Sequence, residues 1–196
     1  MKDNPMKKFI TGVTMAIIVL AIAITSQAAH HEKKEHKGEG KSMATSKAIC
    51  VLTATAGNKV SGVITFMKTA EGTLIEAEIS GLEPNSKHGF HIHQYGDISS
   101  SDGKSTGGHY NPAGHDHSGP DSEMRHIGDL GNLKANDKGV AKYKRLDKVV
   151  KLRGKSGIIG RGITVHAGTD DLKTQPTGAA GARIAVGVIG VANTSK

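Results

Sequence analysis

An all-β fold, an antiparallel sandwich or barrel of eight short strands, is predicted for the chain from Lys47 onwards. Two observations support it. Short stretches rich in apolar and β-branched residues recur there, and glycine, asparagine and aspartate stand between them as turn residues. Aromatic residues make up only 3% of the 196 residues, Trp is absent and glycine occurs 26 times, a composition that argues against a helix bundle.

The strands begin with a clear alternation. Ala48, Cys50 and Leu52 alternate with Ile49 and Val51, so the two sets face opposite sides of a sheet. This setting predicts that the single cysteine is a small apolar core residue and not a reactive or metal-binding thiol. The predicted strands cover 48–54, 60–67, 74–80, 89–95, 130–134, 141–146, 163–167 and 184–191.

Residues 1–29 have the pattern of a secretory signal. A lysine-containing start precedes an apolar stretch over 9–24, and small residues surround a cleavage point after Ala28 or Ala29. A retained membrane anchor is the alternative, but the apolar stretch is short for a membrane span. We therefore expect an exported protein, periplasmic or extracellular, with no stable membrane anchor after cleavage.

Residues 30–46 are charged and polar without periodicity, which predicts a disordered linker ahead of a folded domain over 47–194. His30, His31 and His36 are either an accessory metal site or part of a solvated tail, and both interpretations stay open. The formal net charge is +8, with part of the excess in these first residues. No basic patch is interleaved with aromatic residues, so we expect no nucleic-acid partner.

The segment 96–128 contains no convincing strand or helix, and a loop of this length inside a compact domain usually has a function. Just before it, His91 and His93 stand two apart on a predicted strand, so both imidazoles face one way. Such a pair is half of a site for an ion that prefers imidazole, such as copper or zinc. Alone it is weak evidence, since many such pairs lie on surfaces.

Further metal-binding side chains follow within and after this loop. Three imidazoles and one carboxylate, from His109, His117, His126 and Asp129, suffice for a closed four-coordinate zinc site. His166 stands on an apolar strand, where an unpaired imidazole would be costly to bury. It is either another ligand or a core histidine bonded to a backbone carbonyl. The residues alone therefore indicate two groups of metal ligands.

Six sequence blocks give these ligands a family context. GFHIHQYGD, GGHYNP, HSGP, RHIGDLGN, GITVHAGTDDL and GARIAVGVIGVA resemble, in this order, the signature blocks of copper/zinc superoxide dismutase over nearly all of residues 47–193. The resemblance implies an eight-stranded antiparallel Greek-key barrel or sandwich with long metal-binding and electrostatic loops. It also implies an oxidoreductase whose substrate is superoxide, with one copper and one zinc per subunit.

The same resemblance implies how the ligands divide. Copper would be held by His91, His93, His109 and His166, and zinc by His109, His117, His126 and Asp129. His109 would bridge the two metals, and in the reduced state it would leave copper and carry a proton. Copper would alternate between two oxidation states, converting one superoxide to oxygen and the next to hydrogen peroxide, while zinc would do no redox chemistry.

Three further residues match family positions. Asp170 corresponds to a carboxylate expected to link His91 to His117, with a solvated turn residue as the alternative. Arg183 corresponds to a catalytic arginine at the mouth of the copper site, which would attract and orient a small anion; a surface ion pair is the alternative. Thr177 corresponds to a residue that narrows the channel, and an ordinary turn threonine is the alternative.

The chain departs from the family in one respect. The family disulfide between the metal loop and the last strand cannot form, because neither GDISSSDGKSTGGH nor RIAVGVIG contains cysteine. Its absence removes roughly 3 kcal/mol of constraint on the unfolded chain. Residues 98–101 and Val186 stand where the bridge is expected. We hypothesise that apolar contact from Ile98 and Val186, together with zinc binding, replaces it.

A non-catalytic copper/zinc-binding protein for storage or delivery, on the same scaffold, is the alternative function. The missing disulfide and the His-rich tail favour it, whereas His166 and Arg183 favour the enzyme, since a storage site needs no anion guide. A sandwich module for adhesion would leave the convergent ligands unexplained. Outward Ile49 and Val51 and the apolar tail GVIGVA predict a homodimer.

Overall fold

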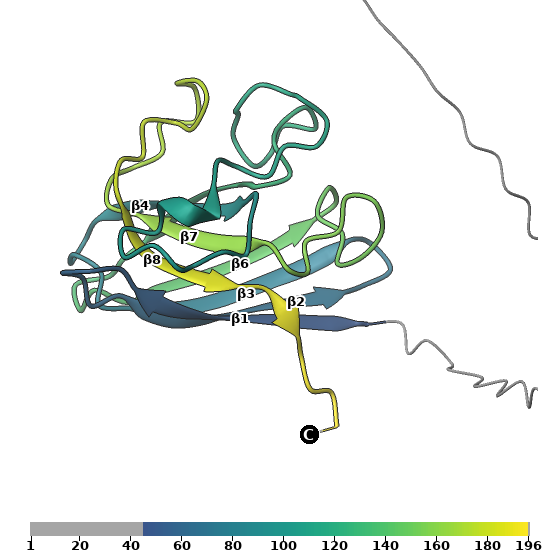
Figure 1. Ribbon diagram of the computed structural model, residues 1–196, viewed down its shortest axis with the longest axis horizontal. Helices are drawn as coiled ribbons and strands as arrows, with labels where there is room; N and C mark the ends of the chain where they lie inside the picture. Colours follow the sequence, from purple (N-terminus) through teal and green to yellow (C-terminus); the bar gives the residue numbers. More distant parts are fainter. Residues whose placement is uncertain (1–44, 196) are drawn as a thin grey trace, which may run out of the picture. The chain divides into compact units, whose positions relative to one another are not determined.

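Alternating strands and turn glycines produce nine antiparallel strands over residues 45–195, the part of the chain that the computed structural model describes (Figure 1). The predicted signal over 1–29 and all but the last two residues of the predicted linker lie outside it. No helix in the described part is long and apolar enough to cross a membrane. The strands are β1 (Lys47–Ala54), β2 (Ser61–Lys68), β3 (Thr73–Ser80), β4 (Lys87–His93), β5 (Asp129–Lys134), β6 (Ala141–Asp147), β7 (Gly162–His166), β8 (Arg183–Val188) and β9 (Gly190–Val191).

The strands pair in the order β5-β4-β7-β8-β1-β2-β3-β6, and β9 pairs with β1. The two ends of this order, β5 and β6, lie near each other, so the sheet curls into a nearly closed barrel. The chain crosses between the two halves of the barrel after β3 and again on either side of β6, which is Greek-key connectivity. The predicted fold class is confirmed.

All eight predicted strands are present, with two shifts that have local causes. The fourth ends at His93 and not at 95, because Gln94 N–H donates to the Gly108 carbonyl (2.8 Å) and leads the chain into the long loop. The eighth divides at Ile189, whose N–H donates to the Arg161 carbonyl (2.9 Å). β8 pairs with β7 as far as Val188, and β9 then pairs with β1 at Ala48 and Ile49.

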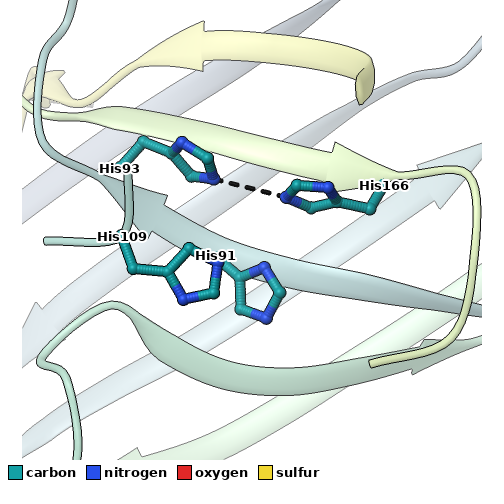
Figure 2. A group of neighbouring side chains, drawn as sticks. All are labelled: His91, His93, His109 and His166. Atoms are coloured by element: carbon teal, nitrogen blue, oxygen red, sulfur yellow. Dashed lines mark hydrogen bonds between the residues drawn. The ribbon is translucent and has the colours of Figure 1, made fainter. Parts of the chain in front are cut away.

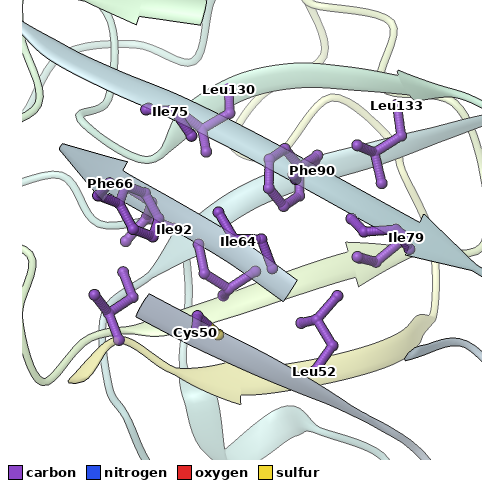
Figure 3. Close-up of a cluster of buried hydrophobic side chains, with 14 of the residues drawn as sticks. Cys50, Leu52, Ile64, Phe66, Ile75, Ile79, Phe90, Ile92, Leu130 and Leu133 are labelled. Atoms are coloured by element: carbon purple, nitrogen blue, oxygen red, sulfur yellow. The ribbon is translucent and has the colours of Figure 1, made fainter. Parts of the chain in front are cut away.

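Inward-facing side chains fill the barrel (Figure 3). Cys50 and Leu52 are buried while Val51 is exposed, as the alternation predicts. Burial raises the pKa of the free Cys50 thiol to about 12, and the predicted core cysteine is confirmed. Burying each large apolar side chain contributes roughly 1.5–3 kcal/mol. The fully buried members include Ile64, Phe66, Ile75, Ile79, Phe90, Ile92, Leu130 and Leu133.

The segment between β4 and β5 is irregular, as predicted, apart from one short 3-10 helix, η1 (Lys104–Thr106). Backbone hydrogen bonds hold both of its arms onto β4. Ile92 N–H donates to the Gly128 carbonyl and the Ile92 carbonyl accepts from Tyr110 N–H, both at 2.9 Å. Gly128 is required there, because a Cβ would collide with the Ile92 carbonyl. The loop is thereby fixed beside the strand that carries His91 and His93.

Candidate metal centre

Two groups of buried metal-binding side chains meet where β4, β7 and the long loop come together. Within each group, one nitrogen or oxygen atom per residue lies within 4.8 Å of the others. All seven residues singled out in the sequence belong to these groups, and His109 belongs to both. Cluster 1 comprises His91, His93, His109 and His166, and cluster 2 comprises His109, His117, His126 and Asp129.

In cluster 1, backbone carbonyls fix the tautomers of two histidines. His93 Nδ1 donates to the Gly107 carbonyl (2.8 Å) and His166 Nδ1 donates to the Gly181 carbonyl (3.0 Å). Since a carbonyl only accepts, both Nδ1 atoms carry hydrogen and both Nε2 atoms present lone pairs. These Nε2 atoms face each other at 3.3 Å (Figure 2), an arrangement that suits a cation between them.

The other two members of cluster 1 contribute unpaired ring nitrogens. His91 Nδ1 and His109 Nε2 are buried and have no hydrogen-bond partner among residues 45–195. Burying a polar nitrogen without a partner is unfavourable, and a bound cation would satisfy both atoms. Four imidazole nitrogens are a donor set that copper accepts in both of its biological oxidation states. Cluster 1 therefore fits copper.

Cluster 2 is built around Asp129. One carboxylate oxygen of Asp129 lies 2.8 Å from His109 Nδ1, 2.9 Å from His117 Nδ1 and 3.2 Å from His126 Nδ1. Its other oxygen accepts from the Ser118 and His126 backbone N–H groups, which orients the carboxylate. Three imidazoles and one carboxylate form a closed four-ligand set, and this chemistry fits zinc.

Burial keeps cluster 1 in the form that binds metal. Desolvation lowers the pKa of His91 to about 3 and that of His166 to about 4, and it also lowers the pKa of His93 and His109. These imidazoles are therefore neutral at physiological pH. At His117, burial lowers the pKa, but hydrogen bonds to Asp129 and Asp170 outweigh it and raise the pKa to about 9.

Asp170 joins the two clusters. Its two oxygens accept from His91 Nε2 (2.8 Å) and from His117 Nε2 (2.9 Å). The Asn132 side chain on β5 makes two hydrogen bonds to the Asp170 backbone. Its amide oxygen accepts from Asp170 N–H (2.8 Å) and its amide nitrogen donates to the Asp170 carbonyl (2.9 Å). Asp170 is thus buried between a ligand of each cluster, where the sequence prediction placed it, and Asn132 is a support that the sequence did not reveal.

Arg183 stands half-buried at the start of β8, against the long loop. Its Nη1 donates to the Gly103 carbonyl (2.6 Å) and its Nη2 to the Gly107 carbonyl (2.7 Å). Burial lowers the pKa of Arg183, but guanidinium groups remain charged in proteins. No carboxylate forms an ion pair with Arg183 in the described residues, so the surface ion pair offered as the alternative does not form there.

The long loop contacts β8 at Gly103. A Cβ on Gly103 would be 2.8 Å from the Val186 side chain, and the chain turns at Gly103 with φ of 73°. Val186 is buried, whereas Ile98 is 40% exposed. The hypothesis that apolar contact from Ile98 and Val186, together with zinc binding, replaces the disulfide stays a prediction.

The structure gives less information on the remaining predicted positions, which are Thr177 and the linker histidines. Thr177 is half-buried on the loop between β7 and β8, and its side chain makes no hydrogen bond within residues 45–195. Its channel role stays a prediction. The linker histidines, His30, His31 and His36, lie outside the described residues.

Two further supports were not foreseen. The Gln175 side chain makes two hydrogen bonds to the His117 backbone. Its amide oxygen accepts from His117 N–H (2.8 Å) and its amide nitrogen donates to the His117 carbonyl (2.9 Å). Buried Arg125 donates through Nη1 to the His126 and Asp129 carbonyls and through Nη2 to Asp147 on β6 (2.5 Å). Both hold the backbone of cluster 2, and neither belongs to a sequence pattern.

Comparisons with known proteins agree with this geometry. The family model for copper/zinc superoxide dismutase (SODC) matches residues 60–189. The chain is 50% identical, over 140 residues, to the Cu-Zn superoxide dismutase of Paramecium bursaria Chlorella virus 1, covering 68% of this chain and 74% of that protein. It is 46% identical to the Candida glabrata Cu-Zn superoxide dismutase, covering 75% of this chain and 99% of that one.

A solved structure gives the same result for the fold. The crystal structure of the clock protein EA4 superposes with a TM-score of 0.70 at 37% sequence identity, covering 76% of this chain and 96% of that chain.

Proposed function

The chain belongs to the copper/zinc superoxide dismutase family, and from that premise we propose which of its residues carry the reaction. The reaction is the dismutation of superoxide to oxygen and hydrogen peroxide, and its cofactors are copper and zinc. The storage or delivery alternative is not favoured, because relatives that are 43–50% identical carry the name of the enzyme.

Copper would be held in cluster 1 by His91 Nδ1 and by the Nε2 atoms of His93, His109 and His166. Zinc would be held in cluster 2 by Asp129 and by the Nδ1 atoms of His109, His117 and His126. Bound copper supplies one-electron redox chemistry and bound zinc supplies a fixed charge without redox chemistry. Asp170 orients a ligand of each site through their outer nitrogens.

The protein side of the reaction falls to two residues. His109 Nε2 is the atom that takes up and delivers a proton, since it has no hydrogen-bond partner among residues 45–195 and since zinc in cluster 2 would hold the opposite nitrogen of the ring. Arg183 draws the superoxide anion toward cluster 1 and orients it by its positive charge. Thr177 limits the width of the approach from the loop that precedes β8.

The observation that carries this proposal is His109, with one ring nitrogen in each donor set. The test is superoxide dismutation and metal content of the copper- and zinc-loaded protein with and without His166→Ala. That substitution removes one cluster 1 ligand and none from cluster 2, so copper content and activity should fall while zinc content stays. Activity equal to that of the unmodified protein would contradict the assignment.

A homodimer is the second proposal. Two exposed apolar side chains are cross-strand neighbours: Val51 on β1 is 62% exposed, and its partner Val63 on β2 is 42% exposed. Adjacent exposed apolar side chains are typical of interfaces between proteins. Ile49 is half-buried, so it contributes less than expected. Light scattering should give twice the chain mass, and Val51→Lys should give a monomer. A monomeric unmodified protein would contradict the proposal.

Export is the third proposal, supported by the signal pattern of residues 1–29. The test is expression in a bacterium with two membranes, followed by mass spectrometry of the protein in each fraction. Periplasmic protein that begins after Ala28 or Ala29 is expected. Protein that retains Met1 in the cytoplasm or the membrane would contradict export.

A further inference from the structure

Thr106 occupies the space between Arg183 and cluster 1. It is the last residue of η1 and is fully buried. Its hydroxyl oxygen lies 3.0 Å from Arg183 Nη1 and 3.2 Å from His93 Nδ1. The same hydroxyl donates to the Gly103 carbonyl at 3.0 Å. No other side-chain atom in the described residues forms hydrogen bonds to both the guanidinium and a cluster 1 histidine.

The hydrogen-bond roles at this hydroxyl follow from its partners. A threonine hydroxyl has one hydrogen and two lone pairs. The hydrogen goes to the Gly103 carbonyl, which can only accept. One lone pair then accepts from Arg183 Nη1, and the other faces His93 Nδ1–H, whose main acceptor is the Gly107 carbonyl at 2.8 Å. These three roles are mutually consistent, and the Thr164 hydroxyl on β7 is a longer fourth neighbour at 3.5 Å.

The Thr106 side chain lies over Gly162 on β7, which has no side chain there. A Cβ on Gly162 would lie 3.2 Å from Thr106 Cγ2 and 3.3 Å from Thr106 Cβ. Thr106 N–H donates to the Gly103 carbonyl (3.2 Å). The hydroxyl is therefore held in one position by the barrel on one side and by the turn of η1 on the other.

We propose that Thr106 is a positioning residue that holds the guanidinium of Arg183 in place relative to His93. The inference rests on the proposed role of Arg183 as the anion guide. The Gly103 and Gly107 carbonyls that accept from Arg183 belong to the long loop, and η1 with Thr106 lies between them, in a chain that has no disulfide between this loop and β8. The hydroxyl of Thr106 is the side-chain contact that ties this loop, the guanidinium and cluster 1 to each other.

The experiment compares Thr106→Val, which keeps the shape and removes the hydroxyl, with Thr106→Ser, which keeps the hydroxyl. If Thr106→Val does not fold, Thr106→Ala replaces it with the same expectation. The matched control is Thr73→Val, because Thr73 is a buried threonine on β3 whose hydroxyl donates to the Val150 carbonyl (2.8 Å). Arg183→Ala tests the premise.

Two readouts are independent of turnover. The first is the rate at which phenylglyoxal modifies Arg183 in the zinc-loaded, copper-free protein, relative to exposed Arg153, by mass spectrometry. The second is the affinity of azide for the copper-loaded protein, followed by electron paramagnetic resonance. Thr106→Val should raise the rate and weaken azide binding by about threefold or more, the effect of losing part of one hydrogen bond to a charged group. Thr106→Ser and Thr73→Val should match the unmodified protein.

The remaining outcomes distinguish a failure of the inference about Thr106 from a failure of the proposed role of Arg183. If Arg183→Ala weakens azide binding and Thr106→Val changes neither readout, Arg183 guides anions without Thr106 and the inference is wrong. If Arg183→Ala leaves azide affinity unchanged, the proposed role of Arg183 fails and the inference fails with it. Equal effects of Thr106→Ser and Thr106→Val would also overturn the inference, because the hydroxyl would then be irrelevant.

Discussion

Arg183 and His93 donate to the same carbonyl oxygen, that of Gly107, at 2.7 Å and 2.8 Å. One peptide group of the long loop is therefore a shared acceptor for the proposed anion guide on β8 and for a cluster 1 histidine on β4. It is a direct connection between the long loop and both strands in a chain that lacks the family disulfide.

Asp170→Asn is predicted to weaken zinc binding by about 10- to 100-fold, the usual effect of removing a group that orients a metal ligand. An asparagine offers one acceptor oxygen, so it cannot accept from His91 and His117 at once. Competition with a chelator of known affinity measures the change. Asp171→Asn is the control, because Asp171 accepts only from its own loop, at Lys173 and Thr174. Similar losses in both variants would contradict the role of Asp170.

Gln175→Ala is predicted to speed hydrogen exchange at the His117 amide by roughly tenfold, because the amide loses the oxygen that it donates to. Exchange followed by NMR in the zinc-loaded protein gives the rate. Lys173→Ala changes an exposed side chain on the same loop and should leave the rate unchanged. An unaltered rate in Gln175→Ala would mean that Gln175 does not hold the loop in solution.

Asp147→Ala is predicted to lower the free energy of unfolding by about 3–5 kcal/mol, because it leaves the buried charge of Arg125 without its partner. Urea denaturation measures the loss. Glu78→Ala removes an ion pair with Lys142 in which both side chains are largely exposed, and it should give no measurable change. If the two variants lost the same stability, the Arg125–Asp147 pair would not be the anchor that its burial indicates.

Most members of the two clusters could be proposed from the residues because their pattern is local, whereas His166 needed the family resemblance. His91 and His93 share a strand face by their spacing of two, and Asp129 closes a histidine-rich loop. Thr106, Gln175 and other supports escaped prediction for a physical reason. Gln175 contacts a backbone 58 residues away, and Thr106 acts only because η1 brings it under Arg183. Such contacts depend on how segments meet in space and leave no periodicity.

The Cys50 thiol is predicted to resist iodoacetamide in the folded protein at pH 9 and to react in urea. Burial raises its pKa to about 12, whereas an unfolded thiol ionises at about pH 8.5. The folded state keeps the Cys50 thiol proton to a higher pH than the unfolded state does. The contribution of Cys50 to stability is therefore complete below about pH 8.5 and is lost as the pH rises toward 12. Mass spectrometry gives the labelled fraction. Rapid labelling without urea would contradict the burial of Cys50.

His109 is proposed to belong to two metal sites at once. The most direct measurement is anomalous diffraction from crystals of the copper- and zinc-loaded protein, recorded at the absorption edges of both metals. The predicted result is copper beside His109 Nε2 and zinc beside His109 Nδ1, each at about 2.0–2.1 Å, the usual length of a bond between metal and imidazole. Two occupied sites with His109 bound to only one metal, or one metal spread over both clusters, would contradict the account.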